Sequence, residues 1–170
     1  MCGATDEIGA APLVVDDDPH ATVMAMRAKC RRVRARFKDL ALVVVDYLQL
    51  MATTGARVEN RTLEVGEISR GLKILSRDLD VAVLACAQVG RAVESRSDKR
   101  PMLSDLRESG SIEADADAVV FLYRDELYRT DTPDRGVAEA IIAKNRSGPT
   151  GTTRLAFLGH CTRFANLARA

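Results

Sequence analysis

The 170-residue sequence has no tryptophan, and only 4% of its residues are aromatic. An aromatic-rich core is therefore excluded. The core must be built from Val, Leu, Ile and Ala, which suits a buried sheet packed against helices. The formal net charge is only +1. This balance excludes nucleic-acid binding through bulk charge, so any DNA contact needs local clusters of Arg and Lys.

Paired cysteines and long apolar runs are also missing. The four cysteines form no Cys-x-x-Cys pair, and the adjacent His160 and Cys161 lack a second pair at zinc-finger spacing. There is no signal peptide or transmembrane run, so we expect a reduced, cytoplasmic protein with no membrane contact. The length fits one domain over residues 1–170.

The residues that are present alternate between strand and helix patterns. Short apolar runs predict strands at Leu13–Val15, Ala41–Val45, Val81–Ala87, Ala118–Tyr123, Val137–Ala143, Thr152–Leu158 and Arg163–Leu167. Apolar residues spaced by three and four predict two helices, one from the N-cap Thr22 to Phe37 and one over Val65–Leu79. This order predicts an α/β fold, with a mainly parallel sheet flanked by helices and a C-terminal antiparallel hairpin.

Two polar residues follow predicted parallel strands. Asp46 closes the apolar run Ala41–Val45, which we expect to be buried on both sides, and Gln88 follows Val81–Ala87. Ligands bind at the carboxyl ends of such strands. A carboxylate there can hold Mg²⁺ near nucleotide phosphates, and a glutamine can hydrogen-bond a γ-phosphate or its attacking water. A strand-end cap and a strand-end amide are the structural alternatives.

Lys144 and Arg146 flank Asn145 just before the Gly148-Pro149 turn. Strand residues two apart project to the same side, so both cations can point one way from the hairpin. Such a pair suits an arginine finger that reaches the nucleotide of a neighbouring subunit. An edge strand protected from aggregation by charge is the alternative.

The stretch Leu103–Asp117 combines a short helix with a glycine-bearing turn. Its Arg107, Ser109, Gly110 and Ser111 are able to meet a phosphate through side chains and backbone amides, whereas a capped turn is the plainer interpretation. Asp115 and Asp117 alternate with alanine, a pattern that favours capping or solvation over metal binding.

Four longer segments resemble the motor domain of DnaB-type replicative helicases, over about residues 11–168, and leave residues 1–10 outside the core. They are VVVDYLQLM (Val43–Met51), VENRTLEVGEISRGLKILSRDL (Val58–Leu79), QVGRAVESRSDKRPMLSDLRESGSIEADADAVVFLYRDE (Gln88–Glu126) and AKNRSGPTGTTRLAFL (Ala143–Leu158). The resemblance implies a RecA-like fold of the P-loop NTPase type. It also implies an ATP-dependent helicase that moves 5′ to 3′ on single-stranded DNA as a homo-hexamer, with a primase and a helicase loader as partners.

The same resemblance implies roles for particular residues. Asp46 matches the Walker B aspartate that acts on Mg²⁺, through a water, and Gln88 matches the glutamine that couples the γ-phosphate to the DNA loops. Lys144 and Arg146 look like the finger pair that acts in trans. The resemblance also places Arg107, Glu108 and Gly110 in the loop that follows the DNA backbone, where Glu108 would orient Arg107 because a carboxylate and a phosphate repel each other.

One departure from this pattern is an absence. The sequence contains no Gly-x-x-x-x-Gly-Lys-Ser/Thr, the loop that holds ATP phosphates. We therefore expect an N-terminally truncated domain that binds ATP weakly and hydrolyses little alone. A non-catalytic module that joins an intact helicase ring is one alternative. A recombinase- or clock-type member of the wider RecA-like group is another, although the LRESG and KNRSGPTG segments favour the helicase branch.

Overall fold

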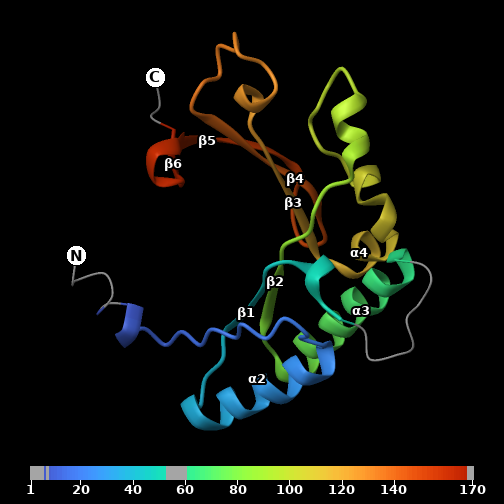
Figure 1. Ribbon diagram of the computed structural model, residues 1–170, viewed down its shortest axis with the longest axis vertical. Coiled ribbons are helices and arrows are strands. Elements are labelled where there is room, and N and C mark those ends of the chain that lie inside the picture. Colours follow the sequence, from blue (N-terminus) through green and yellow to red (C-terminus); the bar gives the residue numbers. More distant parts are fainter. Residues whose placement is uncertain (1–5, 7, 53–60, 168–170) are drawn as a thin grey trace.

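The computed structural model describes residues 6, 8–52 and 61–167, except for the side chains of residues 61 and 107–109. Two sheets are joined by helices (Figure 1). The helices are α2 (Val23–Phe37), α3 (Arg61–Leu79) and α4 (Gly110–Asp115). The strands are β1 (Leu42–Val45), β2 (Ala82–Ala85), β3 (Ala118–Tyr123), β4 (Val137–Asn145), β5 (Gly151–Leu158) and β6 (Arg163–Asn166). Short 3-10 turns comprise η1 (Leu48–Leu50), η2 (Arg91–Ser95), η3 (Leu103–Ser109), η4 (Asp125–Leu127) and η5 (Gly159–Cys161).

Helix α2 begins and ends as its sequence predicts. The Thr22 hydroxyl accepts a hydrogen bond from the Ala25 N–H at 3.2 Å, so one free donor of the first turn is satisfied. At the other end Lys38 adopts a left-handed conformation, and its N–H donates to the carbonyl of Arg34. The buried face of α2 packs through Cys30 against α3.

The core lies between α3 and the parallel sheet. Its first cluster comprises Val45, Leu48, Met51, Ile68 and Leu72. A second cluster contains Cys30, Leu75, Leu79 and Val81. The residues of α3 in both clusters recur at spacings of three and four, so one stripe of this helix covers the sheet.

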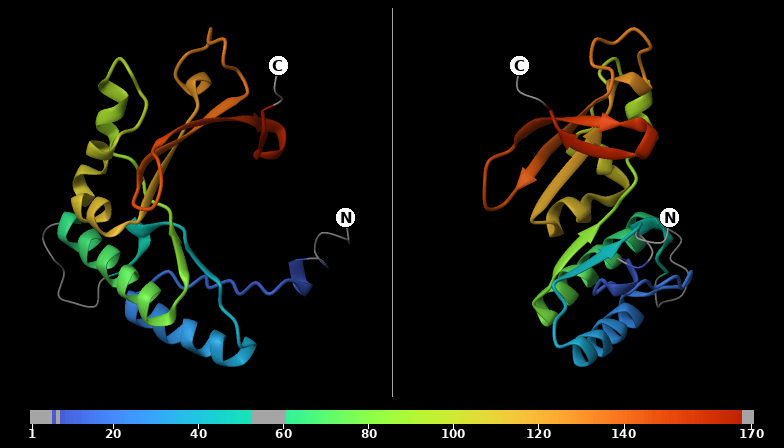
Figure 2. Two further views of the ribbon diagram at one scale, coloured as in Figure 1. Left: turned by 180° about the vertical axis from the view of Figure 1, so that it is seen from behind. Right: turned by 90° about the vertical axis from the view of Figure 1, so that its left-hand side faces the viewer.

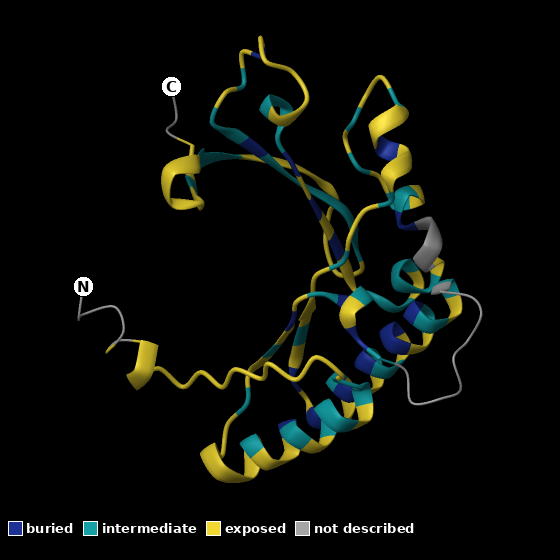
Figure 3. Ribbon diagram, in the orientation of Figure 1, coloured by how far each residue is buried: buried dark blue, intermediate teal, exposed yellow. Residues whose placement is uncertain are grey.

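Only one face of the parallel sheet is covered, which corrects the expectation that β1 is buried on both sides. Val45 is 5% exposed, whereas Leu42 and Val44 are 50% and 56% exposed, and Leu84 on β2 is 55% exposed. Successive strand residues point to opposite faces, and among the described residues helices cover only one of these faces (Figure 3). A continuous apolar run therefore does not establish burial on both sides.

Strand β3 does not join the parallel sheet. It pairs antiparallel with β4 in a separate sheet with the order β3-β4-β5-β6. Its residues alternate between exposed and buried, and Val119 and Phe121 pack with Leu106. Such alternation is typical of an antiparallel sheet with one packed face. Figure 2 shows the two sheets at opposite ends of the molecule, and the α/β class and the C-terminal antiparallel strands are confirmed.

Two local predictions were wrong. Leu13–Val15 is no strand: these residues are 53–79% exposed and pair with no strand of the described chain. A strand needs a neighbour for its backbone N–H and C=O groups, and three apolar residues do not provide one. Gly110 lies in the first turn of α4 rather than in a separate turn. In the part of the chain described, no helix is long and apolar enough to cross a membrane.

Candidate functional site

The carboxyl ends of β1 and β2 bring Asp46 and Gln88 to one edge of the parallel sheet. The two strands pair in register from Leu42 with Ala82 to Val45 with Ala85. Beyond the last pair, the Cys86 N–H donates to the carbonyl of Val45 at 2.9 Å. Asp46 and Gln88 therefore leave adjacent strands at nearly the same level, as the sequence predicted.

A side chain that the sequence reasoning overlooked joins these strand ends. Gln49, in η1, accepts a hydrogen bond through its Oε1 from the Gln88 N–H at 3.3 Å. The Leu48 N–H donates to the carbonyl of Cys86 at 2.9 Å. The sequence signal for this contact was the position of Gln49, three residues after Asp46. One helical turn after the strand end brings such a side chain back over the sheet edge.

The Asp46 carboxylate is exposed and carries no hydrogen bond or ion pair within the described chain. Gln88 is exposed as well, and its backbone is anchored by Gln49. In the described part of the chain, no three His, Cys, Asp or Glu residues gather into a metal-binding group. A single accessible carboxylate fits a Mg²⁺ ion that keeps most of its waters and binds phosphate, but not an all-protein cage.

Lys144 turns toward α4, and Arg146 turns toward the short segment between α4 and β3. The half-buried Lys144 ammonium donates a hydrogen bond to the carbonyl of Glu113. The Arg146 guanidinium pairs with the Asp117 carboxylate at 3.0 Å, and the Arg146 N–H donates to the Asp117 carbonyl at 2.8 Å. The prediction that both cations project to one side agrees with these contacts.

Asn145 shapes the hairpin turn that carries these cations. Its Oδ1 accepts from the Ser147 N–H at 3.2 Å, and its Nδ2 donates to the Pro149 carbonyl at 3.3 Å. A Cβ atom at Gly148 would lie only 2.8 Å from Asn145 Nδ2, so a side chain there would displace the amide. The turn therefore holds its form through Asn145 and the small residue opposite it.

Asp117 does more than cap or solvate. It accepts a hydrogen bond from Lys73 of α3 while it pairs with Arg146, and the Lys73 hydrogen bond, then the charges of Lys73 and Arg146, lower the pKa of this carboxyl group. Its neighbour Asp115 accepts a hydrogen bond from the Ser69 hydroxyl of α3 at 3.0 Å. Sequence reasoning missed these partners because they lie up to 46 residues away along the chain.

The predicted DNA loop spans the end of η3 and the first residue of α4. The side chains of Arg107 and Glu108 lie outside the described residues, so their directions stay predictions. Gly110 is exposed, and a Cβ atom added at this position would meet no atom within 4 Å.

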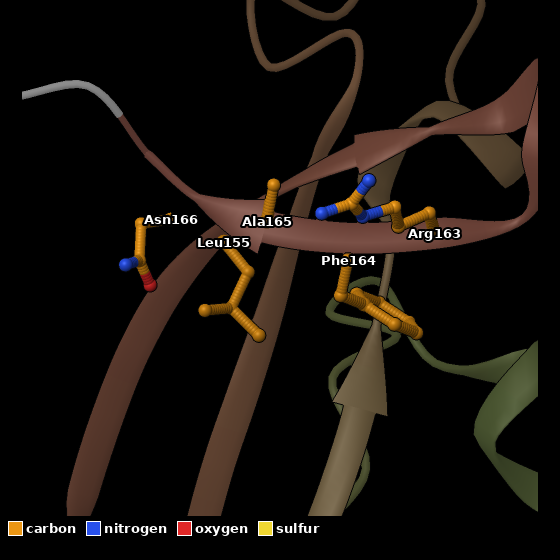
Figure 4. A pocket seen from close by; sticks show the side chains of 5 residues that line it. All are labelled: Leu155, Arg163, Phe164, Ala165 and Asn166. Carbon is orange, nitrogen blue, oxygen red and sulfur yellow. The ribbon is translucent and has the colours of Figure 1, made fainter.

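A shallow hollow on the other sheet contains none of the predicted site residues. It lies on β5 and β6, where Leu155 and Phe164 point to one side of the strands and Arg163 points to the other (Figure 4). The Phe164 ring contacts the Phe157 ring, with the centroids 5.2 Å apart. The Arg124 guanidinium lies 3.8 Å from the Phe157 ring centroid on the same sheet.

Comparison with known proteins shows the family to which the chain belongs. Residues 1–166 match the family described as the DnaB-like helicase C terminal domain. The chain is 55% identical over 163 residues to the replicative DNA helicase DnaB of Mycobacterium intracellulare, covering 96% of the chain and 28% of that protein. It is 51% identical over 166 residues to that of Geobacillus stearothermophilus, covering 98% and 36%. The chain thus spans about a third of the length of these relatives.

Solved structures show the same likeness. One solved ATPase domain superposes with a TM-score of 0.90 at 43% identity, covering 97% of this chain and 58% of that one. A DnaB-like replicative helicase, described with its interactions with primase, gives the same TM-score and identity and covers 97% and 40%. At this identity, the likeness extends beyond the shared fold.

Proposed function

The chain belongs to the DnaB-like helicase C-terminal domain family. We propose that it supplies three parts of an ATP-dependent replicative DNA helicase: the sheet edge that binds the nucleotide, the loop that contacts DNA, and the cations that act on the nucleotide of a neighbouring subunit. One observation carries this proposal: Asp46 and Gln88 stand at the carboxyl ends of two adjacent parallel strands that are linked by the Cys86–Val45 hydrogen bond. In parallel sheets, this edge is where nucleotides bind.

At this edge, Asp46 would hold a water of Mg²⁺, and the ion would neutralise charge on the phosphates of ATP. Gln88 would hydrogen-bond the γ-phosphate or its attacking water, and loss of that phosphate would be transmitted along the segment from Gln88 to η3. An exposed Asp46 without a partner in the described chain supports the first role, and the Gln49 anchor on Gln88 supports the second.

Single-stranded DNA would pass the start of α4, where Arg107, Glu108 and Gly110 lie along the chain. Contacts of this kind go to the phosphate backbone and carry no sequence information. In a homo-hexamer, Lys144 and Arg146 would act on the nucleotide of the next subunit. The proposal includes a primase as partner, because one similar structure is described with its interactions with primase, and a helicase loader follows from the family.

Without a Gly-x-x-x-x-Gly-Lys-Ser/Thr loop, the chain on its own should hydrolyse ATP slowly. The test is a chimera in which this chain replaces the matching 166 residues of the Geobacillus stearothermophilus helicase. We expect ATP turnover stimulated by single-stranded DNA. Asp46→Asn and Gln88→Ala should each lower kcat at least about tenfold, the size of effect seen when a charge-stabilising group is lost.

Asp39→Asn is the matched control, since this exposed carboxylate precedes β1 at the opposite end of the strand. Equal activities of the Asp39→Asn and Asp46→Asn chimeras would contradict the proposed role of Asp46. Mixing two variant subunits tests whether Arg146 acts on the nucleotide of a neighbouring subunit. Rings assembled from Asp46→Asn and Arg146→Ala subunits should regain activity because some interfaces then combine an intact Asp46 with an intact Arg146.

A further inference from the structure

The two cations at the hairpin are occupied within their own chain. Lys144 donates to the Glu113 carbonyl of α4, and Arg146 pairs with Asp117, which immediately precedes β3. In this arrangement, neither cation is free to reach a phosphate on another subunit. The contacts with Glu113 and Asp117 must therefore break before Lys144 and Arg146 can reach the nucleotide of a neighbouring subunit.

The Arg146–Asp117 pair is suited to reversible release. Both side chains are more than half exposed, at 52% and 59%, so water screens the pair and keeps it weak. A phosphate carries more charge than a carboxylate and matches the guanidinium fork with two oxygens. A γ-phosphate can therefore displace Asp117 from Arg146.

Lys73 favours this release. It donates to the Asp117 carboxylate from α3, so Asp117 keeps an opposite charge beside it after Arg146 leaves. The side chain of Lys73 is 21% exposed, and the same helix also binds Asp115 through Ser69. Asp117 is thus fixed on α3 while Arg146 is the exchangeable partner.

We propose that Asp117 is a positioning residue that holds Arg146 at rest and yields it to the γ-phosphate of a nucleotide bound to the neighbouring subunit. This inference rests on the proposed function. Since Asp117 closely follows α4, and α4 begins within the predicted DNA loop, release of Arg146 would also remove one of the contacts that connect the hairpin to that loop.

The first test uses the chain itself. Phenylglyoxal modifies accessible arginines, and peptide mass spectrometry gives the rate at Arg146. Asp117→Asn should raise this rate about two- to fivefold, as expected for loss of an exposed ion pair. Asp98→Asn is the control, because it removes another exposed carboxylate that contacts Arg100 at 3.5 Å and should leave the Arg146 rate unchanged. An unchanged rate in Asp117→Asn overturns the proposal.

The second test uses the chimera described above. With the competing carboxylate removed, Asp117→Asn should lower the KM for ATP about two- to fivefold without lowering kcat, and Asp117→Glu should restore the parent KM. A purely structural role for Asp117 would instead lower the melting temperature and kcat and leave KM in place, and that result overturns the proposal.

The two tests separate this inference from the proposed function. A parent chimera that hydrolyses no ATP, or one that Arg146→Ala leaves fully active, overturns the proposed function and the nucleotide half of this inference with it. An active chimera that needs Arg146 but is indifferent to Asp117 overturns the positioning role alone.

Discussion

Asp105 ties the segment after Gln88 to the start of η3. Its carboxylate accepts hydrogen bonds from the Arg96 guanidinium at 3.1 and 2.9 Å and from the Met102 N–H at 2.8 Å. Its carbonyl also accepts from the Gly90 N–H at 3.2 Å. With its side chain only 6% exposed, Asp105 fixes the path between the carboxyl-end edge of β1 and β2 and the predicted DNA loop.

Asp105→Ala should therefore destabilise the fold by about 2 kcal/mol, because Arg96 loses the partner of a partly buried charge. Urea denaturation followed by circular dichroism measures the loss. Asp98→Ala serves as the matched control, since the Asp98 side chain is 66% exposed and its pair with Arg100 is long. Equal losses in the two variants would show that the buried network around Asp105 does not stabilise the fold.

Tyr123 gives a pH-dependent prediction. Burial, together with the 2.6 Å hydrogen bond that its hydroxyl donates to Asp125, raises the pKa of this phenol from 10.0 to about 12. A raised folded-state pKa means that this stabilisation is complete below pH 10.0 and is lost as the pH rises through about 12. In an alkaline titration of tyrosinate absorbance, one of the three tyrosines should ionise late. Tyr123→Phe should remove that late step, and its persistence would contradict the assignment.

Among the helices, α3 connects both parts of the molecule. One face carries Leu72, Leu75 and Leu79 into the core, and the polar positions Ser69 and Lys73 reach Asp115 and Asp117. The helix therefore supports the parallel sheet that carries Asp46 and Gln88 through packing, and it supports the hairpin through polar contacts with Asp115 and Asp117.

Two adjacent residues of α3 test this division. Leu75 is fully buried, whereas Ile74 is 48% exposed. Leu75→Ala should cost about 3 kcal/mol because it removes transfer free energy and leaves a cavity, and Ile74→Ala should cost less than about 1 kcal/mol. Chemical denaturation of both variants checks the difference. Similar losses would mean that α3 is rotated relative to its position in this structure.

Both sheets of the molecule expose apolar side chains. On β1 and β2 of the parallel sheet, Leu42, Val44 and Leu84 are each at least half exposed, and on β3 of the separate antiparallel sheet the same holds for Val120 and Leu122. Exposed apolar surface of this kind promotes association or partner binding. The chain should therefore bind a hydrophobic dye and self-associate at high concentration.

Neighbouring valines of β1 test this expectation. Val44→Thr lies on the bare face and should reduce dye binding and association, measured by fluorescence and light scattering, with little change in stability. Val45→Thr is the matched variant on the covered face, where Val45 is 5% exposed. It should destabilise the fold by about 2 kcal/mol because it buries a hydroxyl. Unchanged dye binding by Val44→Thr would show that the bare face is not the dye's site.

The sequence by itself determined the local elements and the edge of the parallel sheet. The spacing of apolar residues located α2 and α3, Thr22 marked a helix start, and the polar residues Asp46 and Gln88 marked the carboxyl ends of two strands. These features depend on residues within a few positions of each other, where helix and strand periods act directly. The family resemblance came from the same linear order.

Tertiary structure decided which segments meet. The sequence pattern of β3 does not specify its antiparallel pairing with β4, and the apolar run of β1 does not reveal that one of its faces is bare. The sequence around Asp117 predicts a solvated carboxylate, whereas the fold places Lys73, 44 residues away, and Arg146 beside it. Pairing, burial and ion-pair choice depend on contacts between distant segments. Local pattern limits those contacts, but the packing of the whole chain selects among them.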